Sequence, residues 1–181
     1  MNSTALELAA WAHRGQKRYR EEFTVLTGSG LKKAEEKAEP FILHPMRVAL
    51  NVRRAAATLG SPELVDAGFL DHHERRMQQV ALLHDVIEDT KLKADDLVAA
   101  GFEEGVITDV ETLTRDPEDS YAEYIGKVDY KGTLTAIAVK TADLLDNLDG
   151  YTLDGVFADV SLVKRYRKAL AQLGWTGREA L

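Results

Sequence analysis

Residues 81–90 bring together the side chains of this sequence that are best suited to chemistry: a His-Asp pair, followed one helical turn later by a Glu-Asp pair. In a helix, residues four apart share a face, so His84 is expected beside Glu88. Asp85 is expected beside Asp89 for the same reason. Three carboxylates this close repel one another, which is costly unless a cation or a substrate uses them. The segment therefore predicts a site for metal binding or proton transfer.

A second histidine of interest, His44, directly precedes Pro45 at the start of an expected helix. A residue before proline is driven out of the α region, which restricts the direction in which its side chain leaves the backbone. Considered alone, His44 is more simply interpreted as a partly buried loop histidine.

Asp143 and Asn147 lie four residues apart and share one face of an expected helix whose preceding turns are strongly apolar. Because Asp143 follows the apolar run directly, its side chain is expected to turn towards the interior, where a carboxylate needs a partner. Asp146 and Asp149 are interpreted instead as solvated residues at the polar end of this helix.

Combined, these segments supply two imidazoles and two carboxylates, from His44, His84, Asp85 and Asp143. Nitrogen and oxygen ligands of this kind suit Mn²⁺, Fe²⁺, Zn²⁺ or Mg²⁺ better than a soft metal. With open positions for water and a phosphate, the site would be hydrolytic, because a metal lowers the pKa of bound water and polarises a phosphoryl oxygen. Glu88 and Asp89 would position or deprotonate that water.

The composition indicates a helical protein. The chain has 181 residues, 45% of them hydrophobic, which suits a single domain over residues 1–181 with a sizeable core. Only four prolines occur, and long segments are rich in good helix formers. We find no convincing strand alternation and no internal repeat. The expected fold is therefore all-α, a single compact helical bundle.

The expected helices are separated by glycine, proline and polar signals. They cover about residues 4–13, 45–59, 71–87, 93–100, 105–113, 120–128, 133–148 and 159–173. Residues 19–39 break the pattern and are interpreted as an inserted loop, with a turn at residues 27–30.

Charge and cysteine content exclude several classes. The net charge of −7 argues against nucleic-acid binding, which needs concentrated positive charge. Without cysteine there is no disulfide, thiolate nucleophile or cysteine-type zinc site. No apolar run reaches the roughly 18 residues of a membrane span, and the first residues do not resemble a signal peptide. A cytoplasmic protein without membrane contact is expected.

In their order along the chain, four segments resemble the HD-domain phosphohydrolases, and more closely the hydrolase domain of the RelA/SpoT alarmone enzymes and their small single-domain homologues. The segments are residues 12–18 (AHRGQKR), 40–45 (PFILHP), 82–90 (LLHDVIEDT) and 139–143 (VKTAD) with Asn147. They extend over most of the chain. An isolated His-Asp pair would mean little, whereas this combination is specific for the HD branch.

The resemblance implies an HD-domain helical fold and a role for each matching residue. It implies metal ligands, usually for Mn²⁺, at His44, His84, Asp85 and Asp143, a catalytic acidic pair at Glu88 and Asp89, and nucleotide contacts from Arg18 to the base and Asn147 to the sugar-phosphate part. The family reaction removes pyrophosphate from the 3′ position of guanosine tetra- or pentaphosphate (ppGpp), the alarmones of the stringent response. Substrates vary within this fold, however.

This sequence departs from the alarmone pattern in two places. Residues 19–39 replace a short link beside the expected base pocket, and are expected to form a lid or a contact in a homo-oligomer. Leu144 and Asp149 replace two basic residues, and an acidic group near a polyphosphate is unfavourable unless it faces away. The alternatives are therefore an HD enzyme for another nucleotide or phosphorylated metabolite, or a non-catalytic nucleotide-binding module.

The remaining polar and aromatic candidates have simpler interpretations. Lys140 is expected either to approach a phosphate or to form a structural salt bridge. Trp11 and Trp175 are expected to pack against the core. Structural or surface roles are expected for His13, His72, His73, Arg115 and the basic cluster at residues 164–168.

Overall fold

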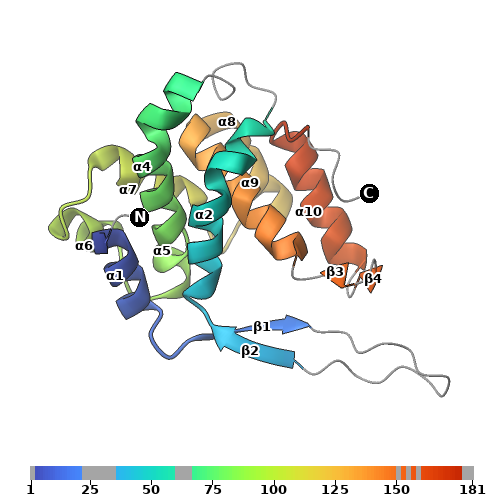
Figure 1. The fold of residues 1–181 in the computed structure, drawn as a ribbon, viewed down its shortest axis with the longest axis horizontal. Coiled ribbons are helices and arrows are strands. Elements are labelled where there is room, and N and C mark those ends of the chain that lie inside the picture. The colour runs from blue at the N-terminus through green and yellow to red at the C-terminus, as the bar shows by residue number, and fades with distance from the viewer. Residues whose placement is uncertain are drawn as a thin grey trace.

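Helices build the fold, as the ribbon in Figure 1 shows. The computed structural model describes residues 3–21, 36–59, 67–149, 152–153, 156–157 and 160–176. The helices are α1 (Ser3–Ala12), α2 (Leu43–Ala57), α4 (Ala67–Leu83), α5 (Val86–Asp89), α6 (Ala94–Ala99), α7 (Glu104–Leu113), α8 (Tyr121–Lys131), α9 (Leu134–Asp149) and α10 (Val160–Gln172). The strands are β1 (Lys17–Glu21), β2 (Glu36–Pro40), β3 (Thr152–Leu153) and β4 (Val156–Phe157). The all-α prediction is confirmed, with two short hairpins added.

Three helices form the centre of the core, since α2 packs against both α4 and α9, and α4 packs against α9. Their inward faces carry apolar residues at helical spacing, as an amphipathic helix requires. The buried set includes Val48, Val52, Ala55 and Ala56 of α2, Met77, Val80 and Ala81 of α4, and Ala136, Val139 and Ala142 of α9. Alanines on α2 and α9 let these two helices approach closely.

Helix ends follow the signals in the sequence. Ser120 and Glu123 form a capping box at the start of α8, in which Ser120 Oγ accepts from the Glu123 amide and the Glu123 carboxylate accepts from the Ser120 amide. Gly101 and Gly174 follow α6 and α10 with φ of 81° and 82°, a left-handed conformation that favours glycine.

Residues 19–39, interpreted from the sequence as an inserted loop, contain parts of two strands at their ends. β1 and β2 pair antiparallel, with Lys17 opposite Pro40 and Glu21 opposite Glu36. Period-2 alternation of apolar residues reveals a strand only when one of its faces is buried, and these two strands are largely polar. The expected turn at residues 27–30 lies outside the described residues.

The prediction of a single helix over residues 71–87 is wrong, because α4 ends at Leu83 and α5 begins at Val86. Nδ1 of His84 lies 2.7 Å from the carbonyl oxygen of Ala81. That carbonyl is the one to which the amide of Asp85 would bond in a continuing helix, so a side chain competes with the helical ladder here. Asp85 accordingly has φ −99° and ψ −4°, in the sparsely populated bridge region.

The two tryptophans differ in their exposure to solvent. Trp175 is half-buried and packs against the core, as expected. Trp11 is 54% exposed, so its expected packing role is wrong; its ring lies 4.7 Å from the guanidinium carbon of Arg14. Among the described residues, no helix combines the length and apolar character that crossing a membrane requires.

A buried carboxylate, Asp109 on α7, joins three elements. Asp109 is fully buried and accepts from Arg76 Nε of α4 at 2.9 Å and from Thr133 Oγ1 at 2.7 Å. Thr133 Oγ1 in turn accepts from the amide of Ala136 near the start of α9. This network connects α4, α7 and the start of α9.

We expect Asp109→Ala to lower the free energy of unfolding by about 1.5–3 kcal/mol, because it removes hydrogen bonds to a charged group and leaves Arg76 without this partner. Urea unfolding followed by circular dichroism measures the change. Glu111→Ala, at an exposed position of the same helix, is the control and should stay within about 0.5 kcal/mol of the native protein. Equal stability of the two variants would contradict the role of Asp109.

Candidate metal centre

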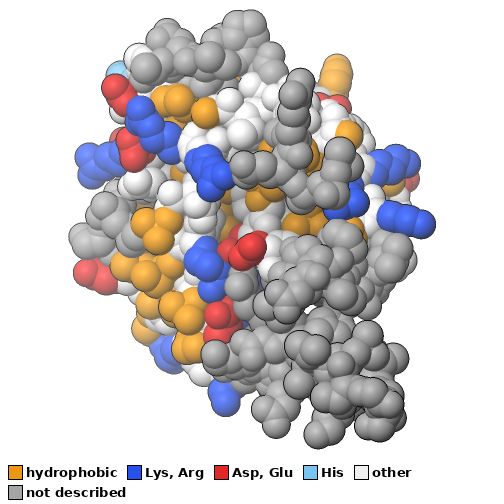
Figure 2. All heavy atoms as spheres, turned by 45° about the vertical axis from the view of Figure 1, so that its right-hand side comes forward, with side chains coloured by type: hydrophobic (Ala, Val, Ile, Leu, Met, Phe, Trp, Pro, Cys, Tyr) orange, Lys and Arg blue, Asp and Glu red, His pale blue; other side chains and the backbone are white. Residues whose placement is uncertain are grey.

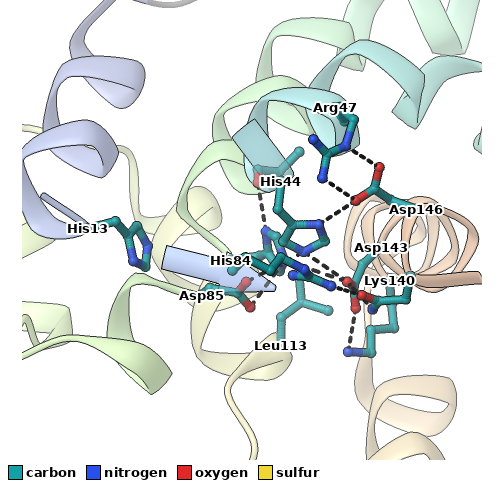
Figure 3. Close-up of polar contacts among 12 residues, drawn as sticks. His13, His44, Arg47, His84, Asp85, Leu113, Lys140, Asp143 and Asp146 are labelled. Carbon is teal, nitrogen blue, oxygen red and sulfur yellow. Dashed lines mark hydrogen bonds and ion pairs between the residues drawn. The ribbon is translucent and has the colours of Figure 1, made fainter. Parts of the chain in front are cut away.

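Two buried histidines from separate helices meet where α2, α4 and α9 converge (Figure 3). His44 lies in the first turn of α2, and His84 follows the last residue of α4. Their ring centroids are 5.2 Å apart with the planes at 67°. Both side chains are nearly inaccessible, so they occupy a site shielded from solvent.

Each imidazole has one nitrogen engaged with an acceptor outside the centre. His44 Nδ1 lies 2.7 Å from Oδ2 of Asp146, and His84 Nδ1 lies 2.7 Å from the Ala81 carbonyl oxygen. These acceptors favour the tautomer with the proton on Nδ1, which leaves the lone pair on Nε2. His84 Nε2 is buried without a hydrogen-bond partner in the described protein. A buried imidazole nitrogen that meets no hydrogen-bond donor and faces carboxylates can bind a metal ion once a cation takes the place of its proton.

Two carboxylates face these nitrogens. Asp85 Oδ1 lies 3.1 Å from His84 Nε2, and Asp85 Oδ2 lies 3.6 Å from His44 Nε2. Asp143 Oδ1 lies 3.2 Å from His44 Nε2 and 3.9 Å from His84 Nε2. One ligand atom each from His44, His84 and Asp85 falls within 4.8 Å of the others, a spacing that can hold a metal ion.

The electrostatics of the centre favour a positive charge within it. Burial lowers the pKa of His84, but the negative charges of Asp85 and Asp143 outweigh burial and raise the pKa to about 9. Burial raises the pKa of Asp143, but Lys140 and His44 hold it well below its usual value. The carboxylates that would keep a proton on His84 can instead stabilise a divalent cation, so the residues fit such an ion.

Asp143 is the anchor for the residues expected to bind substrate. Lys140 Nζ lies 2.8 Å from Asp143 Oδ2 and 5.0 Å from the centroid of the Tyr124 ring. Asn147 Nδ2 donates to Asp143 Oδ1 at 2.8 Å, and Arg18 donates to Asn147 Oδ1. Lys140 thus forms the salt bridge that was one of its two expected roles, and the β1–β2 hairpin reaches the centre through Arg18.

The expected acidic pair lies on α5 at the exposed edge of the centre. Glu88 Oε2 accepts from the Arg115 amide at 3.0 Å. Burial, with the nearby charges of Asp85 and Glu88, raises the pKa of Asp89 to about 6. A bound cation would lower this pKa again. The carbonyl of Asp89 accepts from Gln16 Nε2 at 2.9 Å, which ties α5 to the segment after α1.

The structure overturns the interpretation of Asp146 as a solvated residue. Its side chain is only 6% exposed, and it contacts both His44 and Arg47. Burial raises the pKa of Asp146, but hydrogen bonds from His44 and Arg47 outweigh burial and bring the pKa to about 2. The i, i+3 spacing of His44 and Arg47 is visible in the sequence, but nothing there indicates that both face Asp146 across two helices.

His13 is buried, in agreement with its expected structural role. Its ring stacks on Phe41 with centroids 4.5 Å apart, and its Nδ1 lies 2.7 Å from Gln16 Oε1. Burial lowers the pKa of His13. Because Gln16 also contacts Asp89, this histidine supports the segment that holds α5 in place.

The visible basic side chains of the described residues are spread over one face of the molecule. On the face shown in Figure 2, the Lys and Arg side chains of the described residues are scattered among acidic and apolar ones. Arg115, expected at the surface, donates from its guanidinium to the Asp119 carbonyl oxygen. The observation agrees with the negative net charge of the sequence.

Neither a protein-family model nor a curated protein matches this sequence. A solved structure does match: a metazoan orthologue of SpoT, described as hydrolysing ppGpp and acting in starvation responses. The TM-score is 0.66 and the sequence identity 21%, over 98% of this chain and 89% of the other. At this identity the match establishes the fold. The expected similarity to a SpoT-type hydrolase is therefore confirmed at the level of the fold, and the chain combines that fold with a His-Asp cluster able to hold a divalent metal.

Proposed function

We propose that this protein is a metal-dependent nucleotide phosphohydrolase that removes the 3′-pyrophosphate from guanosine tetra- or pentaphosphate. The observation that carries the proposal is the convergence of His44, His84 and Asp85 within 4.8 Å, with Asp143 beside the two imidazoles. The activity described for the metazoan SpoT orthologue, which shares the fold, supports the choice of substrate.

The four ligand candidates would hold the ion, for which Mn²⁺ is the proposed identity and Fe²⁺, Zn²⁺ and Mg²⁺ are alternatives. The ion would supply an activated water and polarise a phosphoryl oxygen. Glu88 and Asp89, at the exposed edge of the centre, would orient a water and accept its proton.

Arg18 and Asn147 are the proposed contacts to the nucleotide. They are hydrogen-bonded to each other beside Asp143, so a nucleotide bound to them would lie next to the ion. Lys140, with Nζ at Asp143 and its side chain only 13% exposed, is better placed to hold this carboxylate than to meet a phosphate. For residues 19–39, the proposed role is a lid or a contact in a homo-oligomer.

A second candidate is hydrolysis of another nucleotide or a phosphorylated metabolite. It is favoured by the two positions where basic residues of the alarmone pattern are replaced. Leu144 is fully buried in the core, so this position cannot supply a charge to a substrate. Asp149 is exposed and lines a cavity together with Arg47 and Asp146. The positive charge that would bind the distal phosphates must therefore come from other residues or from the ion.

We expect Asp85→Ala to weaken Mn²⁺ binding by more than about 100-fold, because replacing a partner outside the coordination sphere already costs about 10- to 100-fold. Isothermal titration calorimetry with Mn²⁺ measures the affinity. Asp95→Ala removes an exposed carboxylate of α6 and serves as the control. If both variants bind Mn²⁺ as tightly as the native protein, Asp85 is not a ligand.

Glu88→Gln should leave Mn²⁺ affinity unchanged and reduce turnover by roughly 10²- to 10⁴-fold, the usual contribution of a general acid–base group. Glutamine keeps an oxygen that can accept from the Arg115 amide, so the local structure is preserved. The matched control is Glu103→Gln, at an exposed position before α7. Undiminished turnover in the Glu88 variant would refute its catalytic role.

Mn²⁺-loaded protein should convert guanosine tetraphosphate into pyrophosphate and guanosine 5′-diphosphate, resolved by anion-exchange chromatography. A panel of nucleoside triphosphates, deoxynucleotides and sugar phosphates is assayed alongside. Turnover of another compound, with none of the alarmone, would select the second candidate. Tight nucleotide binding without turnover of any compound, by protein shown to hold metal, would identify a non-catalytic module.

A further inference from the structure

Asp146 is the centre of a chain of charged contacts that leads from the β1–β2 hairpin to His44. Oδ2 lies 2.7 Å from His44 Nδ1, and Oδ1 accepts from Arg47 Nε at 2.7 Å. Arg47 also donates to Glu39 of β2 through Nη2, at 2.7 Å, and Nη1, at 3.2 Å. The chain therefore joins β2, α2 and α9. Figure 3 shows the contacts of Asp146 with His44 and Arg47.

The two imidazoles of the centre are held differently. Nδ1 of His84 meets a neutral carbonyl from its own helix, which follows from local backbone geometry. Nδ1 of His44 meets a charged carboxylate from another helix, so the orientation of its ring depends on tertiary structure. A carboxylate that accepts from the far nitrogen of a metal-binding imidazole fixes its tautomer and raises its basicity.

Arg47 is what keeps this carboxylate in place. Two of its donors contact Asp146, Nε at Oδ1 and Nη2 at Oδ2, the second at 3.2 Å. A guanidinium that binds both carboxylate oxygens fixes the plane of the carboxyl group as well as its position. Oδ2 is thereby turned towards His44, while the opposite edge of that ring, Nε2, faces Asp85 and Asp143.

We propose that Asp146, held by Arg47, is the positioning residue of His44: it selects the ring orientation and tautomer that present Nε2 to the metal centre. Glu39 extends the link to the hairpin. The expected gain in metal affinity rests on the proposed metal centre. The orientation of the His44 ring does not depend on it.

The surroundings of Asp146 allow a direct test. Arg47, Asp146 and Asp149 all line a cavity of about 610 Å³ between α2 and α9, with Ala142, Leu145 and Trp175 also in its wall. Shortening Asp146 would extend this cavity without overpacking, and a small carboxylate could enter the space left. Asp149 is the matched control, because it is an acidic residue of the same helix and the same cavity with no contact to His44 among the interactions described.

The experiment compares Asp146→Ala with Asp149→Ala in the full chain. Calorimetry measures Mn²⁺ affinity, and ¹⁵N NMR of the metal-free protein at alkaline pH, where imidazoles are neutral, reports which nitrogen of His44 carries the proton. We expect Asp146→Ala to bind Mn²⁺ about 10- to 100-fold more weakly and to lose the preference for Nδ1–H. Asp149→Ala should match the native protein in both measurements.

Rescue by formate is the second part of the experiment. Added at millimolar concentration, formate should restore Nδ1–H and part of the Mn²⁺ affinity in Asp146→Ala, while changing neither property of Asp149→Ala or the native protein. An Asp146→Ala variant that keeps both the tautomer and the affinity would overturn the proposal. So would a loss of affinity with the His44 tautomer unchanged, because the effect would then not act through the ring.

Two further variants keep the test decisive. If Asp146→Ala does not fold, Asp146→Asn takes its place, because it retains an oxygen acceptor; it should keep Nδ1–H and stay within about 10-fold of the native Mn²⁺ affinity. A larger loss of affinity with Nδ1–H kept would contradict the proposal. Arg47→Met should weaken Mn²⁺ binding, whereas Arg54→Met, in the same cavity wall, should not. If the native protein binds no Mn²⁺, the proposed function fails, while the NMR comparison still decides whether Asp146 positions the ring.

Discussion

The burial of negative charge between α2, α4 and α9 is the constraint on which the rest of this structure depends. Asp143 is almost inaccessible and Asp85 only partly exposed, and each faces two imidazole nitrogens. Removing a carboxylate from water costs several kcal/mol unless charge and hydrogen bonds compensate. Lys140 and Asn147 supply part of the compensation at Asp143, and a bound cation would supply the rest. Such a group of side chains is hard to explain as a device for stability alone.

The same constraint explains how the hairpin and the helices are connected. Two residues of the centre are linked to different strands of the hairpin: Asp143 through Asn147 to Arg18 of β1, and His44 through Asp146 and Arg47 to Glu39 of β2. Both strands of the hairpin therefore end in the hydrogen-bond network of the centre. Because hydrogen bonds in a low-dielectric interior polarise one another, such networks respond as a unit when one member is removed.

Much of this arrangement could be predicted from the sequence, because its strongest signals are local. Apolar spacing and capping residues located the helices, and the His44, His84, Asp85 and Asp143 segments indicated a shared centre. Three features had no local signal. The polar hairpin lacks alternation, the break after Leu83 depends on one histidine bonding to the Ala81 carbonyl, and Asp146 resembles any charged residue at a helix end until α2 is packed against α9. Residues that act through tertiary contacts are thus the ones that a sequence pattern hides.

Helix α5 is short, and its length affects how the centre responds to heating. It is a single turn, held by Thr90 Oγ1 donating to the Val86 carbonyl at 2.5 Å, by Gln16 at the Asp89 carbonyl and by the Arg115 amide at Glu88. Short segments with few such ties open locally at a lower free energy than the core does. His44, His84 and Asp143 stand on long packed helices or directly beside them and Asp85 joins α4 to α5, whereas Glu88 and Asp89 stand on this turn. Local opening would therefore separate the acidic pair from the two imidazoles and Asp143, so the ability to hold a metal would outlast the ability to act on a substrate as the protein is warmed.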